Sequence, residues 1–141
     1  MIGAEVRPCN MALRRSLSNI TIVIVEDHPD TLFFLTQFLN REGAKVLPTD
    51  NAFDGLQAIK THHPNIVLSD INLPNRDGFE LLGDIRALEP RDVGGLPVVA
   101  MTVFTSTTYP GLMIGAGFKA CLNKPFNPDE LLEAIQSGLK T

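Results

Sequence analysis

The chain has 141 residues, of which 44% are hydrophobic and 20% are charged, and its formal net charge is −4. These values are typical of one globular domain and exclude a disordered or collagen-like chain. The acidic balance argues against direct binding of nucleic acid, and no apolar run is long enough for a membrane helix. Cys9 and Cys121 are far apart in sequence, so neither a zinc site nor a disulfide scaffold is expected, which favours a cytoplasmic setting.

Residues 1–19 differ from the rest of the chain. They mix glycine, proline and serine with three arginines and follow no regular period. They also lack the apolar stretch of about seven residues or more that a signal peptide needs. We therefore expect a flexible N-terminal extension over residues 1–19 and a single domain over residues 20–141.

Regular patterning begins at residue 20. Five short apolar runs predict buried strands, and the segments between them have the apolar content and capping residues of helices. The strands are expected at residues 20–25, 44–47, 65–69, 97–101 and 119–123. The helices are expected at residues 29–40, 51 or 54 to 61, 78–88 and 128–139. Glycine and proline within residues 106–117 allow only a short helix there, starting at Pro110.

The alternation of strands and helices predicts the fold class. Strand–helix–strand units join parallel strands through right-handed crossovers, which place helices on both faces of the sheet. We therefore expect an α/β domain with a doubly wound, five-stranded parallel sheet.

Five polar residues lie where the predicted strands end. Glu26 and Asp27 follow the first strand, and Asp70, Thr102 and Lys124 follow the third, fourth and fifth. Each alone is more readily a turn residue or a solvated charge, but ligands bind at this edge of a doubly wound sheet. Clustered carboxylates repel one another unless a cation such as Mg²⁺ lies between them. A metal, a hydroxyl, an ammonium and a nucleophilic aspartate together suit a phosphoryl group.

Four motifs in the chain resemble those of the receiver domains of two-component response regulators. They are Val-Glu-Asp-His-Pro-Asp at 25–30, Leu-Ser-Asp-Ile-Asn-Leu-Pro-Asn-Arg-Asp-Gly at 68–78, Ala-Met-Thr at 100–102 and Lys-Pro-Phe at 124–126. The resemblance covers about residues 19–139. It implies a flavodoxin-like strand order of 2-1-3-4-5, in a stand-alone regulator or a piece of a hybrid histidine kinase.

The resemblance also implies a role for each acidic site residue. Asp70 would accept a phosphoryl group from a phosphohistidine on a histidine kinase or a histidine phosphotransfer protein. Glu26, Asp27 and Asp70 would hold Mg²⁺ together with the backbone carbonyl of Asn72, whose side chain would face the site.

Two further residues have roles that the resemblance implies. Thr102 would be the switch hydroxyl that moves toward the aspartyl phosphate. Lys124 would form an ion pair with Asp70 and then with the phosphoryl group, and a cis peptide bond is expected between Lys124 and Pro125. The switched surface would lie around the fourth and fifth strands.

Three positions depart from the family pattern. Cys121 stands where the family usually has a tyrosine or phenylalanine that flips with the switch hydroxyl, so Phe118 and Tyr109 are candidates for a replacement aromatic side chain. Val103 stands where alanine or glycine is usual, and Phe104 is larger than most residues at its position. We expect Val103 and Phe104 to narrow and cover the entrance to the site, and so to slow hydrolysis of the phosphoryl group.

The first predicted helix carries more apolar residues than one buried face needs. Four of them are enough for that face: Phe34, Leu35, Phe38 and Leu39. This assignment leaves Leu32 and Phe33 on the outside, beside the acidic site.

We expect a surface for the phosphoryl donor at the start of this helix. It comprises His28, Thr31 and Leu32, together with Phe126 after the fifth strand.

Two other functions compete with a signalling module that is not itself an enzyme. Aspartyl-phosphate phosphatases and mutases have a similar site but usually carry a second aspartate as acid or base, where this chain has Asn72, which cannot exchange a proton. A degenerate receiver that works without phosphorylation is disfavoured by the complete set of site residues. The sequence leaves open whether the protein forms a homodimer.

Overall fold

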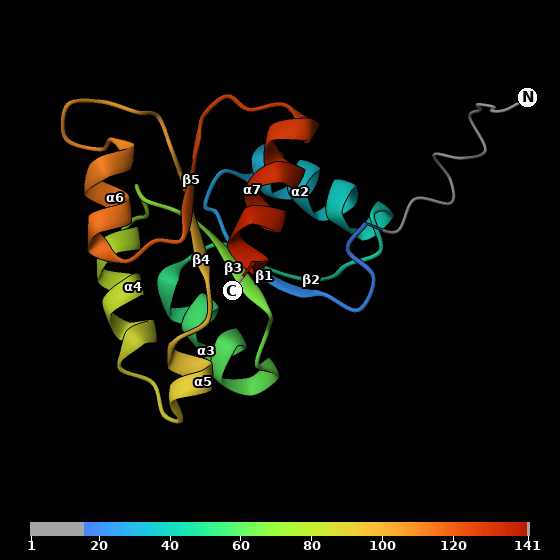
Figure 1. Ribbon diagram of the computed structural model, residues 1–141, viewed down its shortest axis with the longest axis horizontal. Coiled ribbons are helices and arrows are strands. Elements are labelled where there is room, and N and C mark those ends of the chain that lie inside the picture. The colour runs from blue at the N-terminus through green and yellow to red at the C-terminus, as the bar shows by residue number, and fades with distance from the viewer. Residues whose placement is uncertain (1–15, 141) are drawn as a thin grey trace, which may run out of the picture.

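The computed structural model describes residues 16–140, which form one parallel sheet with helices on both faces (Figure 1). The strand order is β2-β1-β3-β4-β5, so the predicted architecture and strand order are confirmed. The strands are β1 (Thr21–Val25), β2 (Lys45–Thr49), β3 (Ile66–Asp70), β4 (Val98–Thr102) and β5 (Ala120–Asn123).

The helices divide between the two faces of the sheet. Two helices cover one face: α2 (Pro29–Arg41) and α7 (Pro128–Leu139). The other face is covered by α3 (Ala52–His62), α4 (Gly78–Arg86), α5 (Arg91–Gly94) and α6 (Pro110–Ala116). The short helix starting at Pro110 is confirmed, whereas α5 has four residues and was not predicted.

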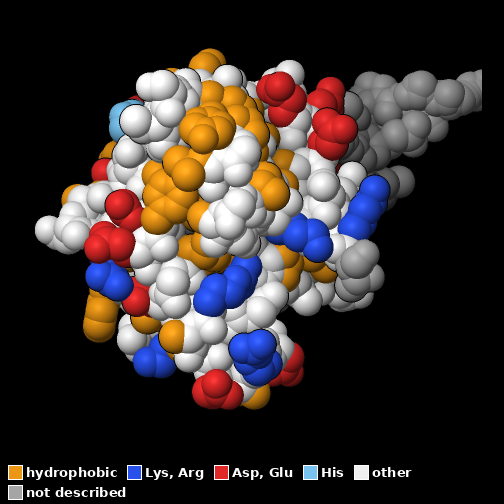
Figure 2. Space-filling model, turned by 60° about the vertical axis from the view of Figure 1, so that its left-hand side comes forward, with side chains coloured by type: hydrophobic (Ala, Val, Ile, Leu, Met, Phe, Trp, Pro, Cys, Tyr) orange, Lys and Arg blue, Asp and Glu red, His pale blue; other side chains and the backbone are white. Residues whose placement is uncertain are grey.

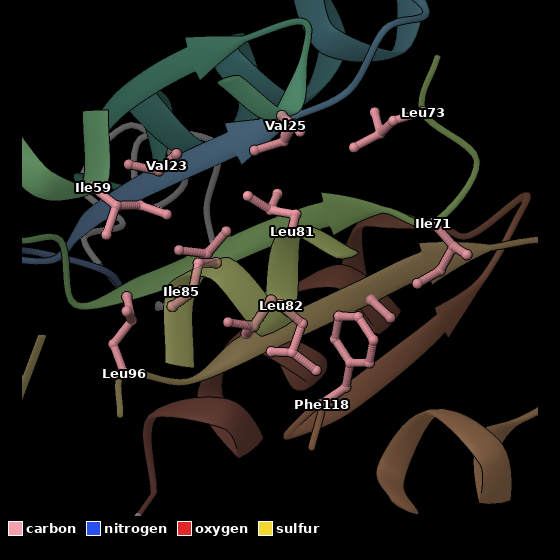
Figure 3. Packing of buried hydrophobic residues seen from close by; sticks show 14 of the residues in the cluster. Val23, Val25, Ile59, Ile71, Leu73, Leu81, Leu82, Ile85, Leu96 and Phe118 are labelled. Atoms are coloured by element: carbon pink, nitrogen blue, oxygen red, sulfur yellow. The ribbon is translucent and has the colours of Figure 1, made fainter. Parts of the chain in front are cut away.

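The alternation of side chains along each buried strand builds two cores. In β1, Ile22 and Ile24 pack on the side of α2 and α7, while Val23 and Val25 pack on the side of α3 and α4. Figure 3 shows the second core, with side chains of α4 pointing toward the sheet. All residues of β3 and β4 are buried, as expected of central strands in a sheet covered on both faces.

The first residues of the packed domain differ from the prediction. Residues 1–15 lie outside the described part of the chain, but residues 16–19 belong to the packed domain rather than to an extension. Leu17 is buried in the core beside α2 and α7, and its N–H donates to the carbonyl of Glu42 at 3.0 Å. The mixture of arginine, glycine, proline and serine in residues 1–19 gave no sign that Leu17 would be buried.

The buried face of α2 also differs from the prediction. Leu35 and Leu39 are buried as expected, but Leu32 is half-buried against the same core and was wrongly placed outside. Phe34, expected to be buried, is 41% exposed, and Phe33 is 67% exposed. Residues 32, 35 and 39 are three and four positions apart, so they share one face of the helix, and Phe34 lies beside that face.

No helix within residues 16–140 has the length and apolar character needed to cross a membrane.

Candidate functional site

Four of the five polar residues at the strand ends line one cavity of about 380 Å³, and Thr102 is not among its lining residues. Its lining residues come from the ends of β1, β3 and β5 and from the start of α2, and they are Glu26, Asp27, His28, Thr31, Asp70, Asn72 and Lys124. The parallel sheet produces this convergence because all of its strands end at the same edge.

The acidic pair after β1 has one buried and one exposed member. The backbone N–H of Glu26 donates to the carbonyl of Thr49 at 3.0 Å, which extends the pairing of β1 with β2 by one residue. The Glu26 side chain is fully buried, and its Oε2 accepts a hydrogen bond from the His28 N–H at 3.1 Å. Asp27 is exposed on the cavity wall, where solutes can reach it.

Asp70 is held by the turn that follows β3. Its Oδ1 accepts a hydrogen bond from the Asn72 N–H at 3.1 Å, and the side chain is largely buried. The turn ends at Gly78, whose N–H donates to the Ile71 carbonyl at 2.8 Å. A Cβ atom on Gly78 would lie 2.6 Å from the Asp70 carbonyl oxygen, so only glycine allows α4 to begin this close to Asp70.

Thr102 and Lys124 reach the site from β4 and β5. The Lys124 N–H donates to the Thr102 carbonyl at 2.8 Å, which fixes the two strand ends side by side. The Thr102 hydroxyl is buried and accepts a hydrogen bond from the Asn72 side-chain amide at 3.3 Å. The Asn72 side chain therefore faces the site as predicted, and the peptide bond between Lys124 and Pro125 is cis as predicted.

One ammonium group joins the two buried carboxylates. Lys124 Nζ lies 2.7 Å from Glu26 Oε1 and 3.2 Å from Asp70 Oδ2. Burial raises the pKa of Glu26, and the hydrogen bond from Lys124 offsets only part of this effect. Burial alone would lower the pKa of Lys124, but the hydrogen bond to Glu26 and the charge of Asp70 outweigh it and raise that pKa. Lys124 is therefore charged at neutral pH.

The donor atoms of the site fit a hard divalent cation. Carboxylate oxygens of Glu26, Asp27 and Asp70 lie within 4.8 Å of one another. An all-oxygen donor set with few protein ligands and an open side suits Mg²⁺, which keeps several of its waters. A cation here would also offset the desolvation cost of ionised Glu26.

The structure separates the two residues expected at the entrance. Val103 is exposed and lines a groove of about 440 Å³ next to Lys124, together with Phe34 and Phe126. Phe104 packs half-buried against the core and lines a different cavity, between β5 and α7. Phe104 is not among the residues that line the acidic cavity or the groove beside it, so its covering of the entrance stays a prediction.

Two residues near the site were missed by sequence reasoning. Phe34 lines the groove beside Lys124, but its apolar character had assigned it to the core. Asn123 accepts a hydrogen bond from the Phe104 N–H at 2.9 Å. A polar residue ending a strand directly before Lys124 was the available signal for Asn123.

The residues expected to meet a partner divide between the cavity and the groove. His28 and Thr31 line the cavity that contains Asp70, and Thr31 also lines the groove with Phe126. Leu32 lines neither, because its side chain packs toward the core.

Comparisons with known proteins agree with this geometry. The family model for the response regulator receiver domain matches residues 22–136. An uncharacterized 14.6 kDa protein of Leptolyngbya boryana is 34% identical over 86% of this chain and 92% of its own length. The sensor histidine kinase GacS of Pseudomonas protegens is 28% identical over 90% of this chain, but the chain spans only 16% of that kinase.

A solved structure gives the same result. The CheY-like response regulator receiver domain protein of Methanospirillum hungatei has a TM-score of 0.76 and 34% identity, over 86% of this chain and 94% of that one. The fold, the converging acidic residues and the family match thus agree, and the chain belongs to the response regulator receiver domain family.

Proposed function

We propose that Asp70 is the residue that accepts the phosphoryl group. The observation that carries this assignment is the position of its carboxylate, at the open cavity and 3.2 Å from Lys124 Nζ. Lys124 and Thr102 would bind the phosphoryl oxygens, and electrostatic stabilisation of this kind is the main protein contribution to phosphoryl transfer. Glu26 is less suited to be the acceptor, because its side chain is fully buried.

The test is incorporation of acid-labile phosphate from a small phosphodonor with Mg²⁺. Wild type should be labelled, and Asp70→Asn should not, while Asp84→Asn, which changes a half-buried carboxylate on α4, should be labelled like wild type. Labelling of Asp70→Asn at the wild-type level would contradict the assignment.

We further propose that Glu26, Asp27 and Asp70 hold Mg²⁺, with the backbone carbonyl of Asn72 as a further ligand. The bound ion would supply charge to neutralise the phosphoryl oxygens. Asp27 is the exposed member of the cluster, so its replacement should disturb packing least. Asp27→Asn should weaken Mg²⁺ binding by at least about tenfold, since loss of an outer-shell partner alone typically costs that much.

The matched control for the metal site is Asp30→Asn. Asp30 is also exposed and lies three residues away, on the groove rather than in the acidic cluster. Titration with Mg²⁺ should show weaker binding by Asp27→Asn than by Asp30→Asn. Equal affinities of the two variants would remove Asp27 from the ligand set.

We propose a cytoplasmic histidine kinase or histidine phosphotransfer protein as the phosphoryl donor. The groove that adjoins the acidic cavity is mainly apolar, and Phe34 and Phe126 provide the aromatic surface that protein contacts favour. His28 and Thr31 stand between this groove and Asp70, so a partner seated there could present its phosphohistidine to the carboxylate.

The partner surface is tested by comparing two kinds of donor. Phe34→Ser should slow transfer from a phosphorylated phosphotransfer protein and leave transfer from a small phosphodonor unchanged. Phe53→Ser on α3 is the control, because Phe53 is also an exposed phenylalanine but lines a different cavity. Equal slowing with both donors would indicate damage to the site rather than loss of docking.

A further inference from the structure

Three basic residues line one pocket at the edge of the sheet opposite to the acidic cavity. The pocket has a volume of about 390 Å³, and Arg86, Lys119 and Lys140 are among its lining residues. Lys119 directly precedes β5, whereas Lys124 follows it, so the two sites lie at opposite ends of this strand. No aspartate or glutamate of residues 16–140 lines the pocket. Its charge is therefore opposite in sign to that of the acidic cavity.

Arg86 is held in place by three backbone carbonyls. It is the last residue of α4, and its Nη1 donates to the carbonyls of Gly94 at 2.9 Å and Leu96 at 2.7 Å. Its Nη2 donates to the carbonyl of Gly117, directly after α6, at 3.1 Å. These bonds connect α4 with the segment before β4 and with the end of α6. The side chain therefore loses little conformational freedom when a ligand binds to it.

The three carbonyls leave part of the guanidinium group of Arg86 available. Among the described residues, neither its Nε–H nor the second N–H of its Nη2 has a hydrogen-bond acceptor. Arg76, in the turn before α4, uses the same two nitrogens for its bonds to Asp84. Such a pair of donors matches the oxygens of a carboxylate or a phosphate group. Arg86 thus keeps the donors with which Arg76 binds an acid.

None of the three cations in the pocket is neutralised by a carboxylate. Within residues 16–140, Arg86, Lys119 and Lys140 take part in no ion pair. Burial lowers the pKa of Arg86, because the half-buried guanidinium has lost water and no acid compensates for it. Arginine nevertheless stays protonated at neutral pH. An anion in the pocket would offset both this loss of water and the repulsion among the cations.

The remaining wall of the pocket is largely apolar. It includes side chains from α6, from α7 and from the segments before β4 and β5, namely Pro97, Ile114, Phe118 and Leu139. In Figure 2, Lys and Arg side chains lie below the hydrophobic region that covers the face between α6 and α7. Ligand pockets typically have volumes of about 300–1,000 Å³ and combine apolar walls with a few polar groups. The size and lining of this pocket therefore suit a small organic anion.

We propose that this pocket binds a small phosphate-bearing anion, with its phosphates on Arg86, Lys119 and Lys140 and its organic part on the apolar wall. Three cations in one pocket favour a ligand whose negative charges lie close together. A phosphate chain has such charges, whereas an acidic peptide supplies one per side chain. A nucleoside triphosphate combines a phosphate chain with a flat organic part. This inference goes beyond the proposed function, because no step of it involves Asp70.

The first test locates the site by titration with ATP, followed through the backbone amide signals in NMR spectra. EDTA is present, so that the acidic cavity holds no Mg²⁺ and repels the phosphates. We expect signals of Gly95, Gly117 and Lys119 to shift, and those of Asp27 and Asp70 to stay unchanged. Shifts confined to the residues around Asp70, or no shift with millimolar ATP, would overturn the proposal.

Three further probes separate the parts of the ligand. Inorganic triphosphate should bind at the same residues but more weakly than ATP, and adenosine should not bind. Equal affinities for triphosphate and ATP would overturn the role of the apolar wall. A peptide of consecutive aspartates that binds at these residues more tightly than ATP would overturn the choice of a phosphate ligand.

A double lysine variant tests the charges without removing a contact of the fold. Lys119 and Lys140 are exposed, so Lys119→Gln combined with Lys140→Gln should keep the structure. ATP binding should weaken by at least about tenfold, because two charge-assisted hydrogen bonds are lost. The matched control combines Lys45→Gln on β2 with Lys60→Gln on α3, two exposed lysines outside the pocket. Equal affinities of the two double variants would overturn the proposal.

Arg86→Lys tests the paired donors, because it keeps the charge but not the planar guanidinium group. It should weaken ATP binding by about 10- to 100-fold, as expected for lost hydrogen bonds to a charged group. Arg86 also binds three carbonyls, so circular dichroism of the variant separates loss of structure from loss of binding. A folded Arg86→Lys protein with wild-type affinity for ATP would contradict the role of Arg86, and the double lysine variant tests the site independently of it.

Discussion

Two clusters of carboxylates on this molecule have similar ion-pair distances but opposite environments. At the ends of β1 and β3, Lys124 Nζ lies 2.7 Å from Glu26 and 3.2 Å from Asp70. On the surface of α4, Arg76 Nε lies 2.6 Å from Asp84, with a second hydrogen bond of 2.8 Å between the same side chains. Distance alone does not distinguish the two clusters.

Exposure to water is what distinguishes them. The Glu26 side chain is fully buried and Asp70 nearly so, whereas Arg76 is about half exposed. Burial raises the pKa of Glu26, while the hydrogen bond from Arg76 lowers the pKa of Asp84. Water screens the pair of Arg76 and Asp84, so this pair contributes little to stability. The buried carboxylates, by contrast, require a neighbouring cation. Burial, rather than the density of acidic residues, therefore prepares the first cluster for a metal ion.

The largest expected difference between the clusters follows from removing each cation. Lys124→Met leaves Glu26 buried without its partner, and the free energy of unfolding without metal should fall by about 2–3 kcal/mol at neutral pH, somewhat less than for a fully buried pair. The loss should be smaller at acidic pH, because the raised pKa of Glu26 lets the carboxyl take up a proton there. Arg76→Met should change stability much less. Urea unfolding in EDTA at both pH values checks this, and equal losses would refute the role given to burial.

The backbone behind each cluster gives the next largest effect. Gly78→Ala places a methyl group 2.6 Å from the Asp70 carbonyl and should lower stability by about 1–3 kcal/mol. Gly83→Ala, on the same helix beside Asp84, meets no atom within 4 Å and should raise stability by up to about 1 kcal/mol. Denaturation midpoints of the two variants should move in opposite directions, and a shift in the same direction would contradict the close approach at Gly78.

A further difference between the clusters is expected in the pH dependence of Mg²⁺ binding, which is linked to the proton on Glu26. Its raised pKa means that the carboxyl keeps a proton at pH values where an ordinary glutamate is ionised. Mg²⁺ binding then releases that proton, so affinity should rise with pH through this interval, by up to about tenfold per pH unit, and level off above the raised pKa. Glu26→Gln should lack this component, and Glu80→Gln should retain it. Calorimetric Mg²⁺ titrations across pH provide the measurement, and a wild-type profile retained by Glu26→Gln would assign the proton elsewhere.

The smallest expected effect concerns access of water to the buried cluster. Val103 lines the groove beside Lys124, so we expect Val103→Ala to speed hydrolysis of the phosphoryl group by about 2- to 10-fold, a change of up to about 1.4 kcal/mol in the barrier. Leu112→Ala, at an exposed position on α6, should leave the rate unchanged. Phosphate release from purified phosphoprotein measures this rate. If Val103→Ala releases phosphate no faster than wild type, Val103 does not limit the entry of water.

The sheet and the placement of the acidic residues were predictable because both follow from local sequence. Buried strands appear as apolar runs, and parallel strands end at one edge, so Asp27, Asp70 and Lys124 had to converge. The surroundings of a side chain that follows a strand end could not be predicted in the same way. Phe104 lines a cavity other than the acidic one, and its backbone N–H donates to Asn123, which comes from another strand.

Tertiary packing also decided the remaining differences. Several apolar positions of α2 could have formed its buried face, and the core selected Leu32 over Phe34. Leu17 is buried through contact with distant parts of the chain, including Glu42, so its neighbours in sequence gave no sign of it. Hydrophobic periodicity predicts that a helix has a buried face, but it does not determine which residues lie at the edge of that face.

The most direct test of this account is to locate the phosphoryl group itself. Wild-type protein is treated with a small phosphodonor and Mg²⁺, and borohydride then converts any aspartyl phosphate to homoserine, which mass spectrometry of the peptides identifies. The account predicts homoserine at position 70 only, lost when Mg²⁺ is removed by EDTA. Homoserine at position 27, or modification at 70 that is indifferent to the metal, would contradict the assignment of Asp70 as acceptor in a metal site formed with Glu26 and Asp27.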